Sequence, residues 1–540
     1  MSGDEPGHRP TRRQFVLAAA CGALALGSES MAQAEGWQDR PNVLFLMCDQ
    51  FRADAIAALG NPHIYTPNID RLVRRGLAFR RAYTTCPVCV AARYTVRTGR
   101  QPPTTGIYSN ALPDLAPGQA PGMEERCGPY LARAMTALGY RAFGVGKFHT
   151  HPWDEDVGYE RQLHSEELYG TPEQRARDGY AGFIAREHPE YDWVEALMGE
   201  RTEMYYMPQM SPLPAHLGVE AWAADRAIEL VRHNDARPWF GFVSFVGPHP
   251  PLAPPLPFNR MYDPDRMPNP VRGSLEADHM DEQIPWMNHM IWAEDINDPH
   301  ARCLRARYYG EISYIDACVG RILDAVEATP QADNTLIAFF SDHGDHMGDH
   351  AAWQKESFFD VSCRVPFLLS WPRQLAAGVE RDDLVCLADL LGIATTAAGK
   401  ADLRDGVDVL GAVISGAAPR RHLCGWYGAP GTDHYKVMTV SGDWKYIYIA
   451  NGGREQLFNL REDPAEIRSL AAARPDVAAD LRALAVEATS RAGSARALQE
   501  GRLRAFPHTQ WPRARIYQFD ASRGVTGFPP TPAQIHYEKH

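Results

Sequence analysis

The sequence has no excess of positive charge and no apolar run long enough to cross a bilayer. Its 540 residues include 55 Lys and Arg against 67 Asp and Glu, which gives a net charge of -12. A chain without a basic excess has no electrostatic attraction to a phosphate backbone, so we expect no nucleic-acid partner. Without an apolar stretch of about 20 residues, we do not expect a membrane-spanning protein.

Cysteine is also sparse, because the chain has 10 in 540 residues and their spacing suggests no disulfide framework. Cys21 lies in an N-terminal segment that we expect to be removed, which leaves an odd number, so we predict no structural disulfides. Hydrophobic residues make up 45% and charged residues 23%. These fractions are ordinary for a globular chain, and the length allows one large domain and a smaller one.

The first 34 residues are predicted to be an export signal rather than part of the fold. Arg12-Arg13 resembles a twin-arginine motif, and an apolar run follows to Leu26. Ala32-Gln-Ala34 then fits a small-residue cleavage site, so the mature chain is expected to start near Glu35. We therefore predict export by the twin-arginine machinery to the bacterial periplasm or beyond.

Several buried-strand patterns are followed directly by polar side chains. Residues 41–48, 239–246 and 334–340 are apolar runs that suit strands of a parallel sheet covered on both faces. Ligands of such sheets bind at the carboxyl ends of the strands. The polar residues at these ends are Asp49, Gln50, His249, Asp342 and His343. Carboxylate and amide oxygens suit a divalent cation, whereas an Asp in this position also caps a following helix.

The segment from Cys86 to Arg100 follows another predicted strand, Leu77–Tyr83, and opens a helix. Cys89 and Arg93 lie one helical turn apart, so both can face one site, where the helix N-terminus presents free N–H groups to an anion. Taken alone, the Cys-x-x-Cys pair also fits a thioredoxin-like redox pair, half of a zinc site or two buried thiols.

The same segment carries a resemblance to a known family. Cys89-x-Ala91-x-Arg93 followed by Thr-Gly-Arg100 resembles the signature of the type I, formylglycine-dependent sulfatases of the alkaline phosphatase superfamily. Ala91 stands where Pro is commoner in that family, and Ala92 stands where Ser is commoner. In the family, this cysteine is converted to formylglycine by a formylglycine-generating enzyme that reads the local sequence.

Two further blocks carry the resemblance. Residues 139–149 contain Gly-Tyr and then Gly-Lys-x-His, which resembles the second sulfatase signature. Lys147 and His149 lie two apart, so in a strand they face the same side. Residues 341–350 begin Ser-Asp-His-Gly and are similar to the metal strand of many sulfatases. Lys355 follows where the family has an active-site lysine.

The resemblance implies an α/β fold, with a large mixed, mostly parallel sheet flanked by helices and a small C-terminal antiparallel α+β subdomain. We expect the catalytic domain at residues 35–400, with an insertion at about 150–216 that shapes the substrate pocket. The subdomain is expected at 401–500, where alternating segments predict antiparallel strands, and a tail at 501–540.

The resemblance also implies a ligand set for one divalent cation. The expected ligands are Asp49, Gln50, Asp342, His343 and an oxygen of modified Cys89. Calcium is the ion that the family usually implies, and the imidazole also admits manganese or another transition ion. His346, Asp349 and His350 are expected either to support the ligands from behind or to be structural.

The implied reaction is hydrolysis of a sulfate ester, of a small molecule or a glycan, through a covalent sulfo-enzyme intermediate. Arg93, Lys147 and Lys355 would hold the anionic oxygens. His249 would protonate the leaving alcohol, and His149 would deprotonate the second hydroxyl of the hydrated aldehyde. A loop residue, Asn110, is expected to donate to a substrate oxygen.

Other functions fit some of the same residues. Asp-Gln at positions 49–50 and Asp-His at 342–343 are also similar to phosphonate monoester hydrolases, so a phosphonate monoester or phosphodiester hydrolase is the alternative. Lys147-x-His149 is the sulfatase form of its strand end. A non-catalytic glycan-binding relative is a further alternative, as is a thiol redox protein. A redox protein would need Cys86 as much as Cys89, whereas a hydrolase would need only Cys89.

Overall fold

The computed structural model describes residues 39–110, 122–166, 172–192, 205–274, 280–491 and 493–513. The predicted export signal lies outside these ranges, as does the part of the tail after residue 513. The strands of the main sheet are β1 (Asn42–Cys48), β2 (Leu77–Tyr83), β3 (Arg141–Gly146), β4 (Arg161–His164), β5 (Trp239–Ser244), β6 (Thr335–Ser341), β7 (Phe367–Ser370) and β8 (Val379–Cys386). The C-terminal strands are β9 (His422–Tyr427), β10 (Lys436–Ser441), β11 (Trp444–Ile449), β12 (Arg454–Asn459), β13 (Leu498–Gln499) and β14 (Arg502–Leu503).

The helices are α2 (Ile69–Arg75), α3 (Cys89–Thr98), α4 (Pro102–Thr105), α5 (Met123–Cys127), α6 (Leu131–Ala137), α7 (Pro172–Arg177), α8 (Gly179–Glu187), α9 (Val219–Val231), α11 (Gln283–Met290), α12 (Asp298–Glu327), α13 (Asp360–Cys363), α14 (Asp389–Ala397), α15 (Val409–Ser415) and α16 (Pro475–Thr489). Across the described ranges, none of the helices combines the length and the apolar character that spanning a bilayer requires.

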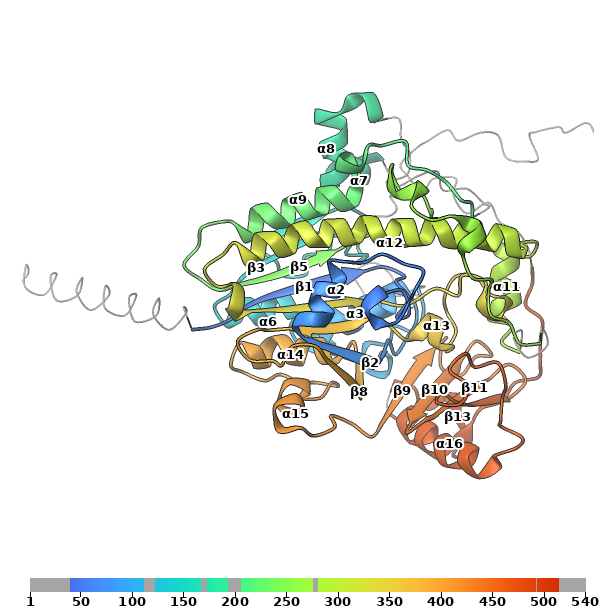
Figure 1. Cartoon of the computed structure of the whole chain (residues 1–540). Helices are drawn as coiled ribbons and strands as arrows, with labels where there is room; N and C mark the ends of the chain where they lie inside the picture. Colours follow the sequence, from blue (N-terminus) through green and yellow to red (C-terminus); the bar gives the residue numbers. More distant parts are fainter. Residues whose placement is uncertain are drawn as a thin grey trace, which may run out of the picture.

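The main sheet has the strand order β4-β3-β5-β1-β6-β7-β2-β8 (Figure 1). β7 is antiparallel to both of its neighbours, β6 and β2, while β1 is parallel to β5 and β6. This arrangement confirms the predicted mixed, mostly parallel sheet. The parallel strands at its centre end at one edge, so the polar residues that follow them are brought together.

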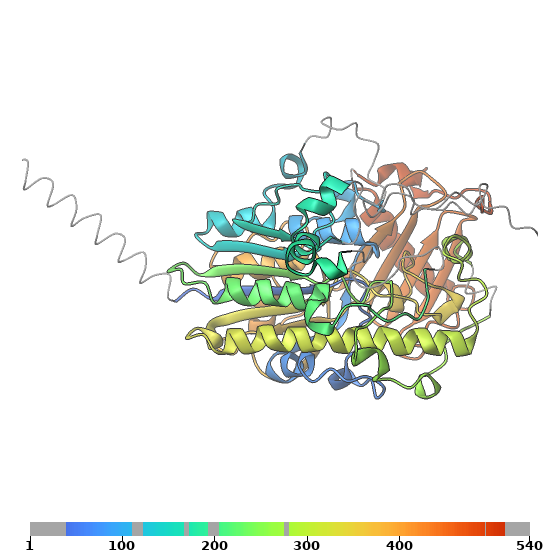
Figure 2. The ribbon, with the colours of Figure 1, turned by 90° about the horizontal axis from the view of Figure 1, so that it is seen from above.

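The two faces of the sheet are covered by different helices. Leu44 and Leu46 of β1 pack into one buried cluster with side chains of α9 and α12. Phe45 and Met47, which alternate with them, pack into a second cluster with side chains of α3, α6 and α14. Figures 1 and 2 show α9 and α12 lying side by side along one face. Burial on both faces explains why β1 is a continuous apolar run.

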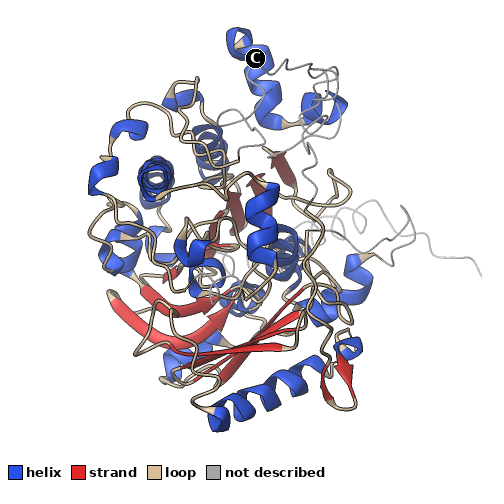
Figure 3. Cartoon of the chain, turned by 90° about the vertical axis from the view of Figure 1, so that its right-hand side faces the viewer, coloured by secondary structure: helices blue, strands red, loops and turns tan. Residues whose placement is uncertain are grey.

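A second, antiparallel sheet has the order β12-β11-β10-β9, and Figure 3 draws the strands of both sheets in red. The alternating sequence segments at 435–440, 444–449 and 456–460 predict three of its strands, and they are confirmed as β10, β11 and β12, whereas β9 was missed. α16 covers one face of this sheet through Leu481 and Ala485, which share a buried cluster with Val437 of β10. The predicted small C-terminal antiparallel unit is therefore present.

Some predicted elements have different bounds. Thr66 followed by Pro67 predicts a helix capped by Thr66. The helix instead starts at Ile69, because Asp316 of α12 accepts from the backbone N–H groups of Asn68 and Ile69 and caps the helix there. The amphipathic pattern at 126–138 predicts one helix, but it is broken into α5 and α6 at Gly128, whose φ of 84° no regular helix admits.

The segment around the second predicted signature also differs from expectation. β3 ends at Gly146, and His149 has a positive φ of 53°, so the strand alternation expected for Lys147 and His149 does not apply. The stretch at 150–216 contains β4, which pairs in parallel with β3 as an edge strand of the main sheet. β4 is short and partly exposed, so it lacks the apolar signal of a buried strand.

Candidate active site

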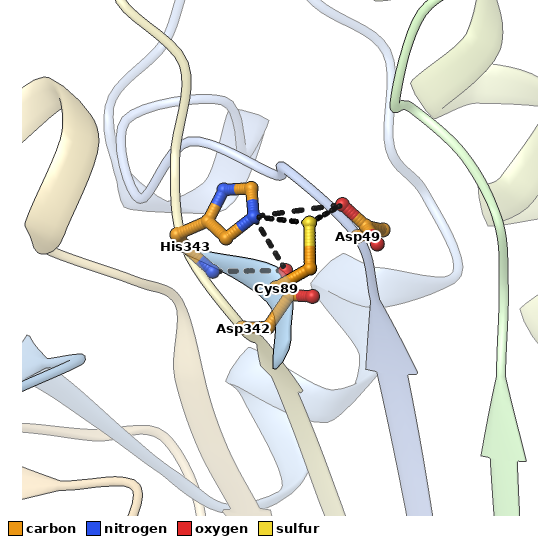
Figure 4. Close-up of side chains that lie close together, drawn as sticks. All are labelled: Asp49, Cys89, Asp342 and His343. Atoms are coloured by element: carbon orange, nitrogen blue, oxygen red, sulfur yellow. Dashed lines mark hydrogen bonds and ion pairs between the residues drawn. The ribbon is translucent and has the colours of Figure 1, made fainter. Parts of the chain in front are cut away.

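Four side chains converge at the carboxyl ends of β1 and β6: Asp49, Cys89, Asp342 and His343 (Figure 4). Because β1 and β6 are parallel neighbours, the residues that follow them lie side by side. Cys89 is the first residue of α3, so its thiol lies at a helix N-terminus. His343 Nε2 lies 3.1 Å from Cys89 Sγ, and 3.7 Å from Oδ1 of each of the two Asp residues.

The donor atoms of these four residues lie within 4.8 Å of one another. Each side chain is buried, with an exposed fraction of 1% or less. Two carboxylate oxygens, an imidazole nitrogen and a fourth group at this spacing fit one divalent cation, because carboxylate and imidazole are common ligands of such ions. Oδ1 of Asp49 and of Asp342 face the cluster, and their Oδ2 atoms bind other partners.

Arg93 binds the Oδ2 atoms of the two carboxylates, which face away from the cluster. Its Nε donates to Asp342 Oδ2 at 3.0 Å, and one terminal nitrogen donates to Asp49 Oδ2 at 2.8 Å. The other terminal nitrogen donates to the Lys147 carbonyl at 2.6 Å and to Ser244 Oγ at 2.8 Å. The guanidinium is therefore fixed by four hydrogen bonds and joins the ends of four strands, β1, β3, β5 and β6.

Lys147 supplies a second positive charge beside the carboxylates of Asp49 and Asp342. Its Nζ lies 2.6 Å from Asp49 Oδ2. Burial alone would raise the pKa of Asp49, but the positive charges of Lys147, His249 and Arg93 outweigh it and hold that pKa well below its usual range. Two buried carboxylates thus face two buried cations.

The imidazole of His343 is oriented by a backbone contact. Its Nδ1 lies 3.0 Å from the Gly344 carbonyl, so Nδ1 carries the proton and donates. Burial lowers the pKa of His343, which favours the neutral ring. The lone pair of Nε2 consequently faces Cys89 and the carboxylates, as metal ligation requires.

Gln50, the one predicted ligand that is not part of the four-residue cluster, lies beside it and has a positive φ of 67°. Its Oε1 accepts from Lys355 Nζ at 2.7 Å, and its Nε2 donates to Asp345 Oδ2 at 2.6 Å. The structure therefore brings Gln50 and Lys355 together next to the carboxylates, and adds Asp345 and Tyr206, which sequence reasoning missed.

His249 and His149, which are predicted to transfer protons, have different surroundings. His249 follows β5, and its Nδ1 lies 2.7 Å from the Pro250 carbonyl, which leaves Nε2 at 3.3 Å from the Tyr205 hydroxyl. The backbone N–H of His149 donates to Glu166 at 3.0 Å, and its buried Nδ1 has no hydrogen-bond partner among the described residues. No hydrogen bond within the described part of the chain joins His149 to Cys89.

The side chain of Asn110, from a loop after α3, lies against the first turn of that helix. Its side-chain oxygen accepts from the backbone N–H of Val90 at 3.0 Å, so it caps the helix that carries Cys89. The prediction that Asn110 donates to a substrate stays a prediction. Its cap adds a structural reason for an Asn at this place in the loop.

The remaining histidines of residues 341–350 lie outside the four-residue cluster. His346 Nε2 lies 2.7 Å from Ser357 Oγ, and His350 stacks on Phe359 with ring centroids 3.7 Å apart. Asp349 forms ion pairs with Arg52 and Arg305. These contacts agree with the structural roles expected for all three residues.

The cysteine pair does not form a disulfide. All nine cysteines in the described ranges are free thiols, Cys86 and Cys89 included. Burial raises the pKa of Cys86 well above its usual value, and the carboxylate of Glu356 raises it further. A buried thiol in that state is a poor nucleophile, which argues against a redox pair.

Known proteins resemble this chain along most of its length. A family model described as Sulfatase matches residues 41–399. The chain is 28% identical over 452 residues to an arylsulfatase of Clostridium perfringens, covering 80% of this chain and 90% of that protein. It is 29% identical over 449 residues to a choline-sulfatase of Rhizobium meliloti, covering 80% and 82%. The solved phosphonate monoester hydrolase of Agrobacterium radiobacter has the same fold, with a TM-score of 0.69 at 24% identity, covering 82% and 94%.

Proposed function

Because the chain belongs to the sulfatase family and is a sulfate-ester hydrolase, we propose that its nucleophile derives from Cys89 and that one divalent cation assists it. The observation that carries the proposal is the convergence of two carboxylates and an imidazole on the Cys89 thiol at the N-terminus of α3. A redox or purely binding role would not require this cluster.

The proposed ligands of the cation are Asp49, Gln50, Asp342, His343 and the modified side chain at position 89. When bound, a divalent cation supplies charge neutralisation and lowers the pKa of the attacking hydroxyl. Calcium is the proposed ion, with manganese as the alternative. The site holds two carboxylates that are already paired with cations, so it attracts a metal less strongly than a site with three or four free acids.

We propose that a formylglycine-generating enzyme converts Cys89 to an aldehyde, which is then hydrated to a pair of hydroxyl groups. One hydroxyl gives its proton to solvent, and its oxygen bonds to the ester sulfur while the bond from sulfur to the alcohol oxygen breaks. His249 gives that oxygen a proton, so the alcohol leaves neutral. Arg93, Lys147 and Lys355 hold the sulfate oxygens as their negative charge grows.

The second half of the proposed reaction releases sulfate. His149 takes the proton of the remaining hydroxyl, the carbon–oxygen bond to sulfate breaks, and the aldehyde re-forms. A serine ester has no second hydroxyl on that carbon and could not eliminate in this way. This difference gives a reason for a modified cysteine at position 89.

The test is hydrolysis by purified protein co-expressed with a formylglycine-generating enzyme. An aryl sulfate, a phosphonate monoester and a phosphate diester are compared, with Cys89→Ala and Cys86→Ala as matched variants and mass spectrometry to score the conversion. We expect sulfate release that Cys89→Ala abolishes and Cys86→Ala retains. Equal loss in both variants would overturn the proposal in favour of a thiol pair.

Phosphonate monoester or phosphodiester hydrolysis is the second candidate. Gln50 and His343 stand where further acids would make the site more negative, and a phosphonate monoester hydrolase shares the fold. Sulfate monoesters, phosphonate monoesters and phosphate diesters each carry one negative charge, so one site could bind all three. A preference for the phosphorus esters over the aryl sulfate in the same assay would establish this candidate.

We also propose that the chain is exported through the twin-arginine machinery. Arg12-Arg13, the apolar run and the Ala-x-Ala site support this assignment. A reporter fused to residues 1–40 should be exported, and Arg12→Lys with Arg13→Lys should keep it in the cytoplasm. Export of the double variant would contradict the proposal.

A further inference from the structure

The carboxamide of Gln50 is held from both ends. Its Nε2 lies 2.6 Å from Asp345 Oδ2 and 3.2 Å from the Tyr206 hydroxyl. Its Oε1 lies 2.7 Å from Lys355 Nζ. A carboxamide has one acceptor end and one donor end, so these partners fix which end faces which side.

Only one orientation of the amide satisfies these neighbours. A flipped amide would place its N–H groups against the ammonium of Lys355 and its oxygen against the carboxylate of Asp345. Both contacts would be repulsive, in a region where Asp345 is fully buried. Oε1 of Gln50 therefore stays on the side of Lys355.

Tyr206 connects this support to the loop that carries Lys355. Its hydroxyl donates to Asp345 Oδ2 at 2.6 Å and accepts from the backbone N–H of Gln354 at 3.0 Å. Gln354 and Glu356, on either side of Lys355, have positive φ angles of 72° and 74°. Such backbone is sparsely populated for residues with side chains and persists where the surroundings hold it.

The carboxyl of Asp345 is fully buried and accepts hydrogen bonds from neutral groups. Its Oδ2 accepts from Gln50 and Tyr206, and its Oδ1 accepts from the backbone N–H of Met347 at 2.8 Å. Burying a carboxyl is costly in stability. Its use in orienting Gln50 gives a functional reason for that cost.

We propose that Asp345 and Tyr206 are positioning residues that lock Gln50 with its oxygen available to the cation and to Lys355. This inference rests on the proposed function, since it gives Gln50 its role as a ligand. Hydrogen bonds from residues behind a metal ligand orient that ligand, and their loss costs about 10- to 100-fold in metal affinity.

The experiment measures metal affinity rather than turnover. Full-length protein with Cys89 converted to formylglycine, as mass spectrometry verifies, is stripped by chelation and titrated calorimetrically with Ca²⁺ and then Mn²⁺. Asp345→Asn removes the charge and lets the amide of Gln50 adopt either orientation. We expect about tenfold weaker binding in Asp345→Asn. Tyr206→Phe, which removes one hydroxyl, should weaken binding in the same direction.

A double-mutant cycle separates positioning from general structure. In a Gln50→Ala background, Asp345→Asn should cause no further loss of metal affinity, because its effect passes through the missing amide. Asp316→Asn is the matched control, since Asp316 is another buried carboxylate with neutral donors but caps α2. It should leave metal affinity unchanged.

The outcomes are distinct. Equal loss from Asp345→Asn in both backgrounds, or no loss in the wild-type background, would overturn the inference and leave the proposed function standing. Absence of cation binding by the wild-type protein would instead overturn the metal ligation in the proposed function. If Asp345→Asn does not fold, the cycle of Tyr206→Phe with Gln50→Ala decides in the same way.

Discussion

Replacing Arg93 by alanine tests whether the charges of the site balance one another without a metal. The guanidinium is 1% exposed and donates to Asp342 at 3.0 Å and to Asp49 at 2.8 Å. Its removal leaves Asp49 paired with Lys147 and takes from Asp342 Oδ2 the cation that it pairs with. Removing one partner of a buried ion pair costs about 3–5 kcal/mol, so the unfolding free energy should fall by that amount at pH 7.

The assay is urea unfolding of chelated protein, followed by the same measurement with Ca²⁺. A cation that binds only the folded protein, at 100 times its dissociation constant, should raise the unfolding free energy by about 2.7 kcal/mol. It replaces part of the lost positive charge. Acid should reduce the difference in unfolding free energy between wild type and Arg93→Ala. Since the folded pKa of Asp49 is lowered, its ion pairs stabilise the protein above about pH 4, and this contribution is lost as the pH falls further.

Arg321→Ala is the control, because its ion pair with Asp225 is exposed and such pairs contribute about 0–1 kcal/mol. The reasoning is refuted if Arg93→Ala loses no more than this control, or if its loss is the same at pH 3 and pH 7. Either result would mean that the two carboxylates do not depend on the guanidinium.

Three further predictions concern other parts of the structure. Asn110→Ala removes the cap on Val90 and should lower the unfolding free energy by about 1 kcal/mol in urea, whereas Asn110→Asp should retain it; no difference between the two would contradict the cap. Burial raises the pKa of Glu220 to about 8, whereas the unfolded chain releases this proton above about pH 4.3. Between these two pH values the folded protein holds the extra proton, so its stability falls as the pH rises. Melting temperatures from pH 5 to 8 should therefore fall less steeply in Glu220→Gln, and parallel curves would exclude this. Trp511→Ala should speed amide exchange in α11, because the Trp511 ring packs edge-on against Trp286 at 6.1 Å; unchanged exchange there would refute it.

The central strands and the site at their ends were predictable for one physical reason. Strands buried on both faces read as continuous apolar runs, and in a parallel sheet the residues after them meet at one edge. β1 and β6 follow this rule, so the apolar runs place Asp49, Asp342 and His343 at one edge of the sheet, and the resemblance to the sulfatase signatures marks these residues as ligands. Arg93 was identified from its spacing of one helical turn from Cys89.

The supporting residues could not be found in the same way. Tyr206 follows a stretch without clear periodicity, and its hydroxyl reaches Asp345 across 139 positions of sequence. Such a contact depends on the path of a loop, which no local pattern specifies. Asp345 itself lies three residues after Asp342, and a buried acid in that place was a signal that could have been read. β4 and β9 were missed because neither is a long apolar run.

The burial of Cys89 bears on when the proposed conversion to an aldehyde could take place. The side chain is 1% exposed, at the first turn of α3. A modifying enzyme needs access to this thiol, which the packed helix denies in the folded chain, so the proposed conversion would precede folding. The aldehyde would then be made in the compartment where the chain is synthesised, before the proposed export to the place where the enzyme works.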